Sequence, residues 1–127
     1  MTITLYQASV PPFLQILRAL RAVLAKARHQ CDATKVQPEV LLQARLYPNM
    51  FPLVRQVQIA TDFAKGAAAR LAGLEPPRYE DTETTFEQLA ERIDRTVAFL
   101  ESIPPERIDG QEERTVELKV GGQPQTF

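Results

Sequence analysis

The sequence predicts an all-α fold: an antiparallel helical bundle that ends in a short β-hairpin. Apolar residues recur at helical spacing in long segments bounded by proline, glycine and capping residues. The spacing changes to the two-residue period of a strand only near the end of the chain. With 127 residues, the chain has the length of one domain with its own core, so we expect a single helical-bundle domain over residues 1–127.

The first predicted helix covers residues 10–30. Ser9 is its expected N-cap, and Pro11 and Pro12 then fall in the first turn, where a missing N–H has no partner to lose. Its apolar side chains share one stripe at helical spacing: Phe13, Ile16, Leu17, Leu20, Val23, Leu24 and Ala27.

The third predicted helix, residues 51–72, follows a short helix over residues 38–46 and is the element around which the chain is organised. Asn49 is its expected N-cap, and Gly73 is expected to close it in the left-handed conformation. One apolar face carries Leu53, Val57, Ala60, Phe63, Ala64, Ala67 and Leu71, and Val54, Ile59 and Ala68 widen it. Because this arc exceeds half of the circumference, we expect the helix to be central in the bundle or to pack on a second chain.

The polar side of the same helix carries Arg55, Gln58, Asp62 and Lys65. Gln58 and Asp62 are four residues apart and Asp62 and Lys65 three, so they can pair along a solvated face. Gln56 differs because it falls at the margin of the apolar face. We expect a half-buried amide there, either in a structural hydrogen bond or lining a pocket.

The fourth predicted helix covers residues 85–102. Thr84 and Glu87 form a capping-box pattern at its start, in which each side chain satisfies a backbone donor of the other. Its apolar stripe consists of Phe86, Leu89, Ile93, Val97 and Leu100. Phe99 falls outside this stripe and is expected to face a flank of the bundle or a partner.

The tail predicts a β-hairpin over residues 115–127. Residues 115–120 alternate with period two, which is typical of a half-buried strand. Gly121 and Gly122 suit a tight turn because both accept positive φ, and Pro124 makes the return strand an edge. Since an isolated hairpin is only marginally stable, we expect this one to pack on the helices.

Composition excludes several classes of protein. With 15 basic and 16 acidic residues, the net charge of −1 argues against nucleic-acid binding, despite a helix–turn–helix outline around residues 38–72. The N-terminal apolar region is interrupted by Gln15, Arg18 and Arg21, so we expect neither a signal peptide nor a membrane span. A single cysteine indicates no internal disulfide and a cytoplasmic protein.

Residues that carry chemistry are sparse. His29, the single histidine, falls on the polar side of the first helix and is expected at the surface. Cys31 falls toward the apolar stripe, where we expect a small buried hydrophobe, and no second histidine is present to activate it. We therefore expect no nucleophile set, no metal and no cofactor.

Four blocks of the sequence resemble a known family: LYQASVPPFLQIL, LLQARLYPNMFPLVRQVQIATDFAKGAAARLAG, LEPPRYEDTETTFEQL and VELKVGGQPQTF. The family is DUF1993, a domain of unknown function and a branch of the DinB/YfiT-like superfamily. The resemblance covers nearly the whole chain and implies a four-helix bundle. It also implies a second possible function, because several members of that superfamily bind a divalent metal through three histidines and include thiol-dependent transferases and hydrolases.

The sequence departs from that pattern in two ways. One histidine cannot supply a three-histidine site from one chain. Members of the resembled family typically continue past the hairpin into a last long helix, whereas this sequence stops at Phe127. We therefore expect either a truncated product or a bundle completed by another chain, and no catalytic residue is carried over.

Four polar residues near the expected core are candidates for a ligand pocket: Tyr6, Arg45, Gln56 and Asp62. For each, a cap, a structural hydrogen bond or an ion pair is the alternative. The sequence thus predicts a small-ligand-binding or homo-oligomeric protein without chemistry of its own, with a dimer expected and neither nucleic acid nor a membrane as partner. The alternative is a DinB/YfiT-like metal-assisted enzyme that acts on a small thiol or electrophile.

Overall fold

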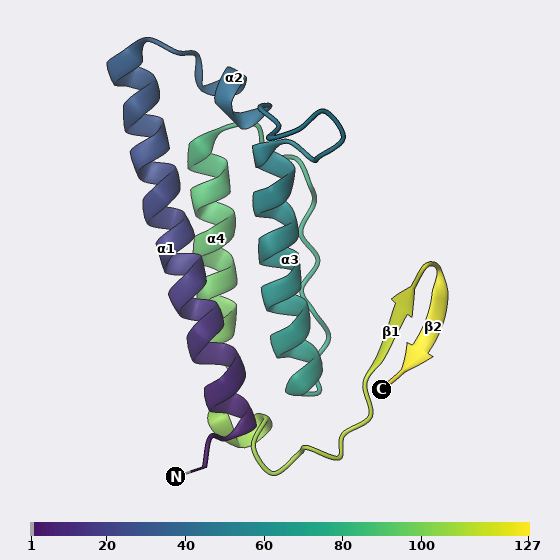
Figure 1. Cartoon of the computed structure of the whole chain (residues 1–127). Helices are drawn as coiled ribbons and strands as arrows, with labels where there is room; N and C mark the ends of the chain where they lie inside the picture. Colours follow the sequence, from purple (N-terminus) through teal and green to yellow (C-terminus); the bar gives the residue numbers. More distant parts are fainter. Residues whose placement is uncertain (1) are drawn as a thin grey trace.

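Three long helices lie side by side, and a hairpin stands at the C-terminal end of the chain (Figure 1). The computed structural model describes residues 2–127, apart from the side chains of Lys119 and Val120. The elements are α1 (Leu5–Thr34), α2 (Pro38–Leu42), α3 (Leu53–Leu71), α4 (Phe86–Glu101), the 3-10 helix η1 (Pro105–Arg107), β1 (Glu117–Val120) and β2 (Gln123–Thr126). The predicted helical fold with a C-terminal hairpin is confirmed.

The direction of the helices follows from their connections. α1 runs opposite to both α3 and α4, whereas α3 and α4 run the same way, because residues 72–85 return along the length of α3 before α4 begins (Figure 1). α4 packs closely on both other long helices, and α1 and α3 contact each other less. The central position, one of the two alternatives expected for residues 51–72, therefore belongs to α4.

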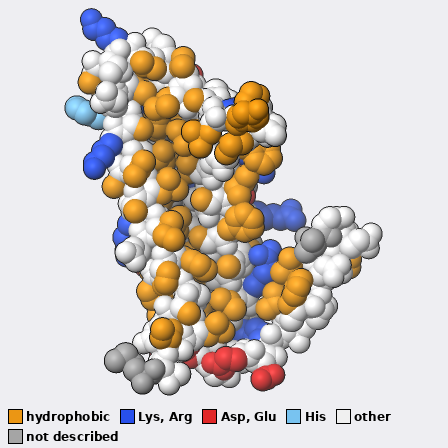
Figure 2. All heavy atoms as spheres, viewed as in Figure 1, with side chains coloured by type: hydrophobic (Ala, Val, Ile, Leu, Met, Phe, Trp, Pro, Cys, Tyr) orange, Lys and Arg blue, Asp and Glu red, His pale blue; other side chains and the backbone are white. Residues whose placement is uncertain are grey.

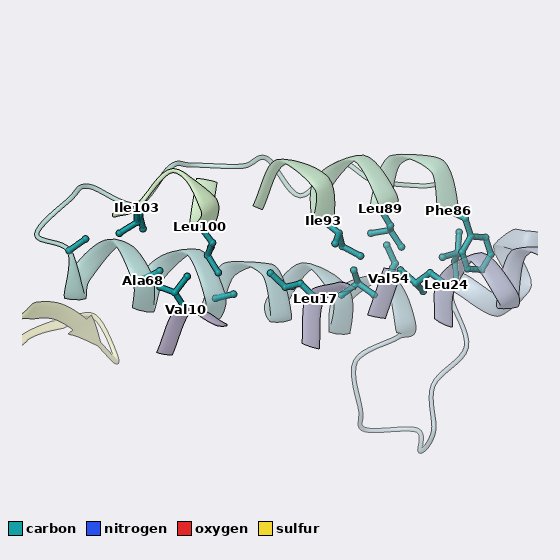
Figure 3. Packing of buried hydrophobic residues seen from close by; sticks show 14 of the residues in the cluster. Val10, Leu17, Leu24, Val54, Ala68, Phe86, Leu89, Ile93, Leu100 and Ile103 are labelled. Carbon is teal, nitrogen blue, oxygen red and sulfur yellow. The ribbon is translucent and has the colours of Figure 1, made fainter. Parts of the chain in front are cut away.

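The core fills the space where α4 meets α1 and α3. Buried residues of α1 recur every seven positions, as Val10, Leu17, Leu24 and Cys31. Figure 3 shows Leu24 near Phe86 at one end of the stack and Val10 near Leu100 at the other. Each fully buried aliphatic side chain of this kind contributes about 1.5–3 kcal/mol relative to exposure.

α1 begins five residues earlier than predicted, at Leu5 rather than at residue 10. Thr4 and Gln7 form a capping box, in which the Gln7 N–H donates to Thr4 Oγ1 at 3.1 Å and the Thr4 N–H donates to Gln7 Oε1 at 3.0 Å. Ser9, the predicted N-cap, lies within the helix, where its hydroxyl donates to the Leu5 carbonyl at 2.8 Å. Pro11 and Pro12 are accommodated inside the helix rather than in its first turn.

The boundaries of α2 and α3 also differ from the predicted ones. α2 ends at Leu42 instead of residue 46. Pro52, not Asn49, is the N-cap of α3, because its extended backbone (φ −66°, ψ 164°) precedes the first helical residue. The predicted closing glycine is confirmed: Gly73 has a φ of 70°, and the Arg114 guanidinium donates nearby to the Leu71 carbonyl at 3.3 Å.

The hairpin has the predicted turn but not the predicted packing. Gly121 and Gly122 have φ values of 60° and 83°, as a two-residue turn with positive φ requires. Val116 and Phe127 exchange two further backbone hydrogen bonds of 2.8 and 2.7 Å. The hairpin nevertheless stands apart from the helix stack in Figure 1, because the side chains of β2 are polar or small and all exposed.

α1 is long and apolar enough, by length and composition alone, to cross a membrane, a property that core helices and signal sequences share. The sequence predicted no membrane span, because Gln15, Arg18 and Arg21 interrupt the apolar region. In the structure both arginines face α4, where Arg18 pairs with Glu101 and Arg21 Nε lies 2.6 Å from Asp94 Oδ1. α1 is thus engaged as a helix of the stack.

Candidate functional site

An apolar surface lies along the groove between α1 and α3, on the side of the stack opposite α4. Figure 2 shows hydrophobic side chains running down this groove. The most prominent are Phe63, Ile16 and Val23, which are 74%, 66% and 60% exposed. We call this surface the α1–α3 face; it comprises Phe13, Ile16, Leu20, Val23 and Ala27 of α1 and Leu53, Ala60, Phe63 and Ala67 of α3.

The spacing of these residues is that of a helix–helix seam. On α1, the steps between successive members from Phe13 to Ala27 alternate between three and four residues. On α3, the same alternation runs from Leu53 through Gln56 to Ala67. Such a 3–4 repeat places side chains as knobs for a neighbouring helix. These two seams flank one groove. They are separate from the buried heptad residues of α1, which pack toward α4.

The middle of the groove is hollow. A cavity of about 250 Å³ lies there, lined by Phe13, Ile16, Leu17, Ala60, Phe63, Ala64 and Ala67. All of these side chains are apolar. Because alanine side chains are small, another side chain or helix can approach this part of α3 closely.

A second cavity, the α2-end cavity, lies between α2, the segment that follows it and the start of α3. Its volume is about 440 Å³, and its apolar walls come from Leu41, Ala44, Leu46, Met50, Phe51 and Leu53. Arg45 and Gln56 supply its polar groups. Arg45 Nη1 donates to the Met50 carbonyl at 2.6 Å, and Gln56 Nε2 donates to the Phe51 carbonyl at 3.4 Å.

Two of the four predicted pocket residues, Arg45 and Gln56, therefore lie at one cavity. Gln56 is exposed rather than half-buried, and its side chain donates to the Phe51 carbonyl of the segment before α3. Tyr6 lies near the other end of the stack, where its N–H donates to Asp109 Oδ1 at 2.9 Å, and it lines none of the cavities described here. A ligand-binding role for these residues stays a prediction.

Asp62, the fourth candidate, belongs to a buried charged cluster centred on Arg92 of α4. The Arg92 side chain is fully buried, and its Nη2 lies 2.7 Å from Asp62 Oδ1. Its Nη1 lies 3.0 Å from Asp81 Oδ1 and 3.0 Å from Glu83 Oε1, and its Nε donates to Thr61 Oγ1 at 2.7 Å. Each of the three guanidinium nitrogens therefore donates to an oxygen, as a buried charge requires.

The same cluster corrects the prediction of a solvated face on α3. Gln58 and Lys65 are only 5% and 6% exposed. Lys65 Nζ lies 3.1 Å from Asp62 Oδ1 and 3.8 Å from the centroid of the Tyr79 ring. The face is covered because residues 72–85 return across it, which a wheel drawn for one helix does not include.

Arg92 was not among the predicted site residues, although the sequence carries a signal for it. Arg92 and Thr96 interleave with Leu89, Ile93 and Leu100 at helical spacing, so a charged residue falls within the apolar stripe of α4. A charge at such a position must be paired when the helix is packed. Glu83, its least exposed partner, lies on the crossover, where no helical pattern marks it.

A third hollow, a polar cleft of about 1030 Å³, lies between α3, residues 74–80 and β1. Asp62, Lys65, Arg70, Arg78 and Glu80 give its walls charges of both signs. Among residues 2–127, no group of three or more His, Cys, Asp and Glu side chains is arranged to hold a metal ion. The metal-assisted alternative therefore stays a prediction.

His29 and Cys31 lie where the sequence places them: His29 is exposed and the Cys31 thiol is buried. Phe99, expected to face a flank or a partner, is half-buried and packs against the core.

Comparison with solved structures shows that this arrangement of helices is that of a DinB family member. The chain is similar to the crystal structure of a DinB family member from Shewanella denitrificans, with a TM-score of 0.84 and 35% sequence identity. The match covers 94% of this chain and 67% of that chain.

The chain belongs to the family described as "Domain of unknown function (DUF1993)", whose model matches residues 5–127. The resemblance inferred from the sequence is thereby confirmed. A search among curated proteins found no match.

Proposed function

We propose that the chain is a homodimeric interaction protein and that it binds a second copy of itself through the α1–α3 face. The observation that carries this proposal is the pair of 3–4 seams that α4 leaves uncovered on one side of the stack. Contiguous exposed apolar surface of this kind marks interaction sites in soluble proteins. The fold family supports no more specific function.

The face has the features that a twofold contact needs. A twofold interface pairs the same surface with itself, so it must carry both projections and recesses. Phe63 and Ile16 project, and the alanine-lined cavity of about 250 Å³ beside them is a recess. In the dimer, Phe63 of each copy enters the recess of the other, between Ala60 and Ala67.

A helix of a longer chain is the competing occupant of the groove. This chain covers 67% of the DinB relative, so part of that relative has no counterpart here. A helix from such a part would use the same seams, but it would leave a chain without that helix monomeric. The two occupants are therefore separated by the association state of these 127 residues.

Sedimentation velocity over the micromolar range tests the proposal. Wild type is expected to sediment as a dimer, and Phe63→Asp and Ile16→Asp are expected to sediment as monomers with unchanged circular dichroism. The matched control is Ile3→Asp, since Ile3 is a similarly exposed apolar residue away from the face. A monomeric wild type, or a control that dissociates as readily as Phe63→Asp, contradicts the proposal.

A further inference from the structure

The α2-end cavity has the dimensions of a small-molecule site. Its volume of about 440 Å³ falls within the range of roughly 300–1,000 Å³ that is typical of ligand pockets. Its walls are apolar, and they come from three segments: α2, the loop after α2 and the first turn of α3. Such a site takes an apolar ligand body and uses few polar groups to orient it.

Arg45 is the charged group at this cavity. One of its N–H donors is directed at the Met50 carbonyl, 2.6 Å away. No carboxylate among the described residues forms an ion pair with it. A guanidinium carries five N–H donors in a fixed fork, so Arg45 keeps donors for a further acceptor.

The other cation near this end of α3 is already neutralised. Arg55 Nη1 lies 2.9 Å from Asp81 Oδ2, on the side of α3 that the crossover covers. The cavity thus offers a single uncompensated positive charge beside apolar walls. That combination is complementary to a monoanion with an apolar chain, and a planar carboxylate matches the guanidinium fork.

We propose that the α2-end cavity binds aliphatic monocarboxylates of medium chain length, with the carboxylate on Arg45 and the chain against Leu41 and Leu53. Leu46, Met50 and Phe51, which are exposed around the mouth, become covered by the bound chain. Met50 adds adaptability to this wall because methionine is flexible and polarizable. Gln56 also lines the cavity, and its amide NH₂ donates one hydrogen bond to the carboxylate.

This site lies apart from the centre of the proposed dimer contact, although Leu53 and Gln56 of the α3 seam also line the cavity. The contact is centred on Phe63, two turns or more along α3 from the cavity, whereas Arg45 lies outside the α1–α3 face. Phe63→Asp is therefore expected to abolish dimerisation without abolishing ligand binding. Arg45→Gln is expected to weaken ligand binding without changing dimerisation.

Titration of the labelled protein with decanoate, followed by NMR chemical shifts, tests the inference. Decanoate kept below its micelle concentration is expected to saturate, with shifts concentrated in residues 41–56. Decanol has the same chain without the charge and is expected to bind about tenfold more weakly, as loss of a charge-assisted hydrogen bond implies. Equal binding of the two compounds, or shifts spread along the α1–α3 face, overturns it.

Variants locate the site. Arg45→Gln is expected to weaken decanoate binding about tenfold, and Arg45→Lys, which keeps the charge, is expected to recover part of it. Arg78→Gln, which removes an arginine from the polar cleft, is the matched control. Variants of Arg45 also remove its hydrogen bond to the Met50 carbonyl, so they alter the loop as well as the charge. Ala44→Trp keeps that hydrogen bond, fills the cavity and is expected to abolish binding. Decanoate binding that survives Ala44→Trp contradicts the assignment.

Discussion

Arg92 joins three parts of the molecule through one side chain. Its guanidinium contacts Asp62 on α3 and both Asp81 and Glu83 on the crossover, while its own backbone lies in α4. Glu83 is the least exposed of these carboxylates, with 6% of its side chain accessible. Removal of one member of a buried ion pair is costly because it leaves the other charge without a partner.

Replacement of Arg92 by methionine is expected to destabilise the fold by about 3–5 kcal/mol, because Glu83 is left buried and unpaired. Urea denaturation followed by circular dichroism measures this loss. Arg78→Met is the control, and its exposed side chain is expected to matter by less than about 0.5 kcal/mol. Equal effects of the two variants would show that the cluster is not structural.

Glu87 is expected to make stability depend on acid pH. Its pKa is lowered from 4.5, first by the hydrogen bond to its own backbone N–H and then by Arg28, whose Nε lies 3.1 Å from Glu87 Oε1. A lowered pKa means that the folded state favours the carboxylate. The stabilisation is therefore present above 4.5 and is lost as the pH falls through the folded-state pKa.

A carboxyl NMR titration checks this prediction. The Glu87 pKa is expected below 4.5 in wild type and closer to that value in Arg28→Gln. The stability difference between wild type and Glu87→Gln should shrink as the pH falls. If this stability difference grew as the pH fell, the Glu87 pKa would be raised in the folded state rather than lowered.

Single-residue environments were predictable where one helix determines them. His29 and Cys31 lie on the sides of α1 that the wheel assigns. Gln58 and Lys65 do not, because the chain that covers them comes from residues 72–85, which have no periodic pattern. The partners of Arg92 could not be predicted for the same reason, since they depend on the path of that crossover.

At the scale of elements, the start of α4 shows how local signals compete. Thr84 with Glu87 and Thr85 with Gln88 are two overlapping capping boxes, and the structure uses the second. The Gln88 N–H donates to Thr85 Oγ1 at 3.1 Å. Tertiary packing favours this choice because Phe86 then begins the helix and is buried against α1.

Thr85→Ala is accordingly expected to lower the free energy of unfolding by about 1 kcal/mol, the usual contribution of a threonine N-cap. Thr84→Ala should cost clearly less, since its hydroxyl caps no helical N–H. Chemical denaturation of the two variants compares them directly. A larger loss of stability for Thr84→Ala would show that Thr84, the residue predicted from the sequence, is the N-cap.

At the scale of the whole molecule, the α1–α3 face follows from the position of α4. α4 packs between α1 and α3 on one side and leaves the opposite groove uncovered. The sequence predicted that the wide apolar arc of α3 needs a central position or a second chain. It could not choose between them, because amphipathicity shows which residues avoid water and not which surface covers them.

The measurement that tests the dimer most directly is an isotope-filtered NOE experiment on a mixture of labelled and unlabelled chains. It detects contacts between copies only. We expect NOEs from the Phe63 ring of one copy to the methyl groups of Ala60 and Ala67 of the other. Two outcomes would contradict a dimer built on the α1–α3 face: intermolecular NOEs confined to the hairpin, or no intermolecular NOEs at concentrations where sedimentation velocity shows only dimer.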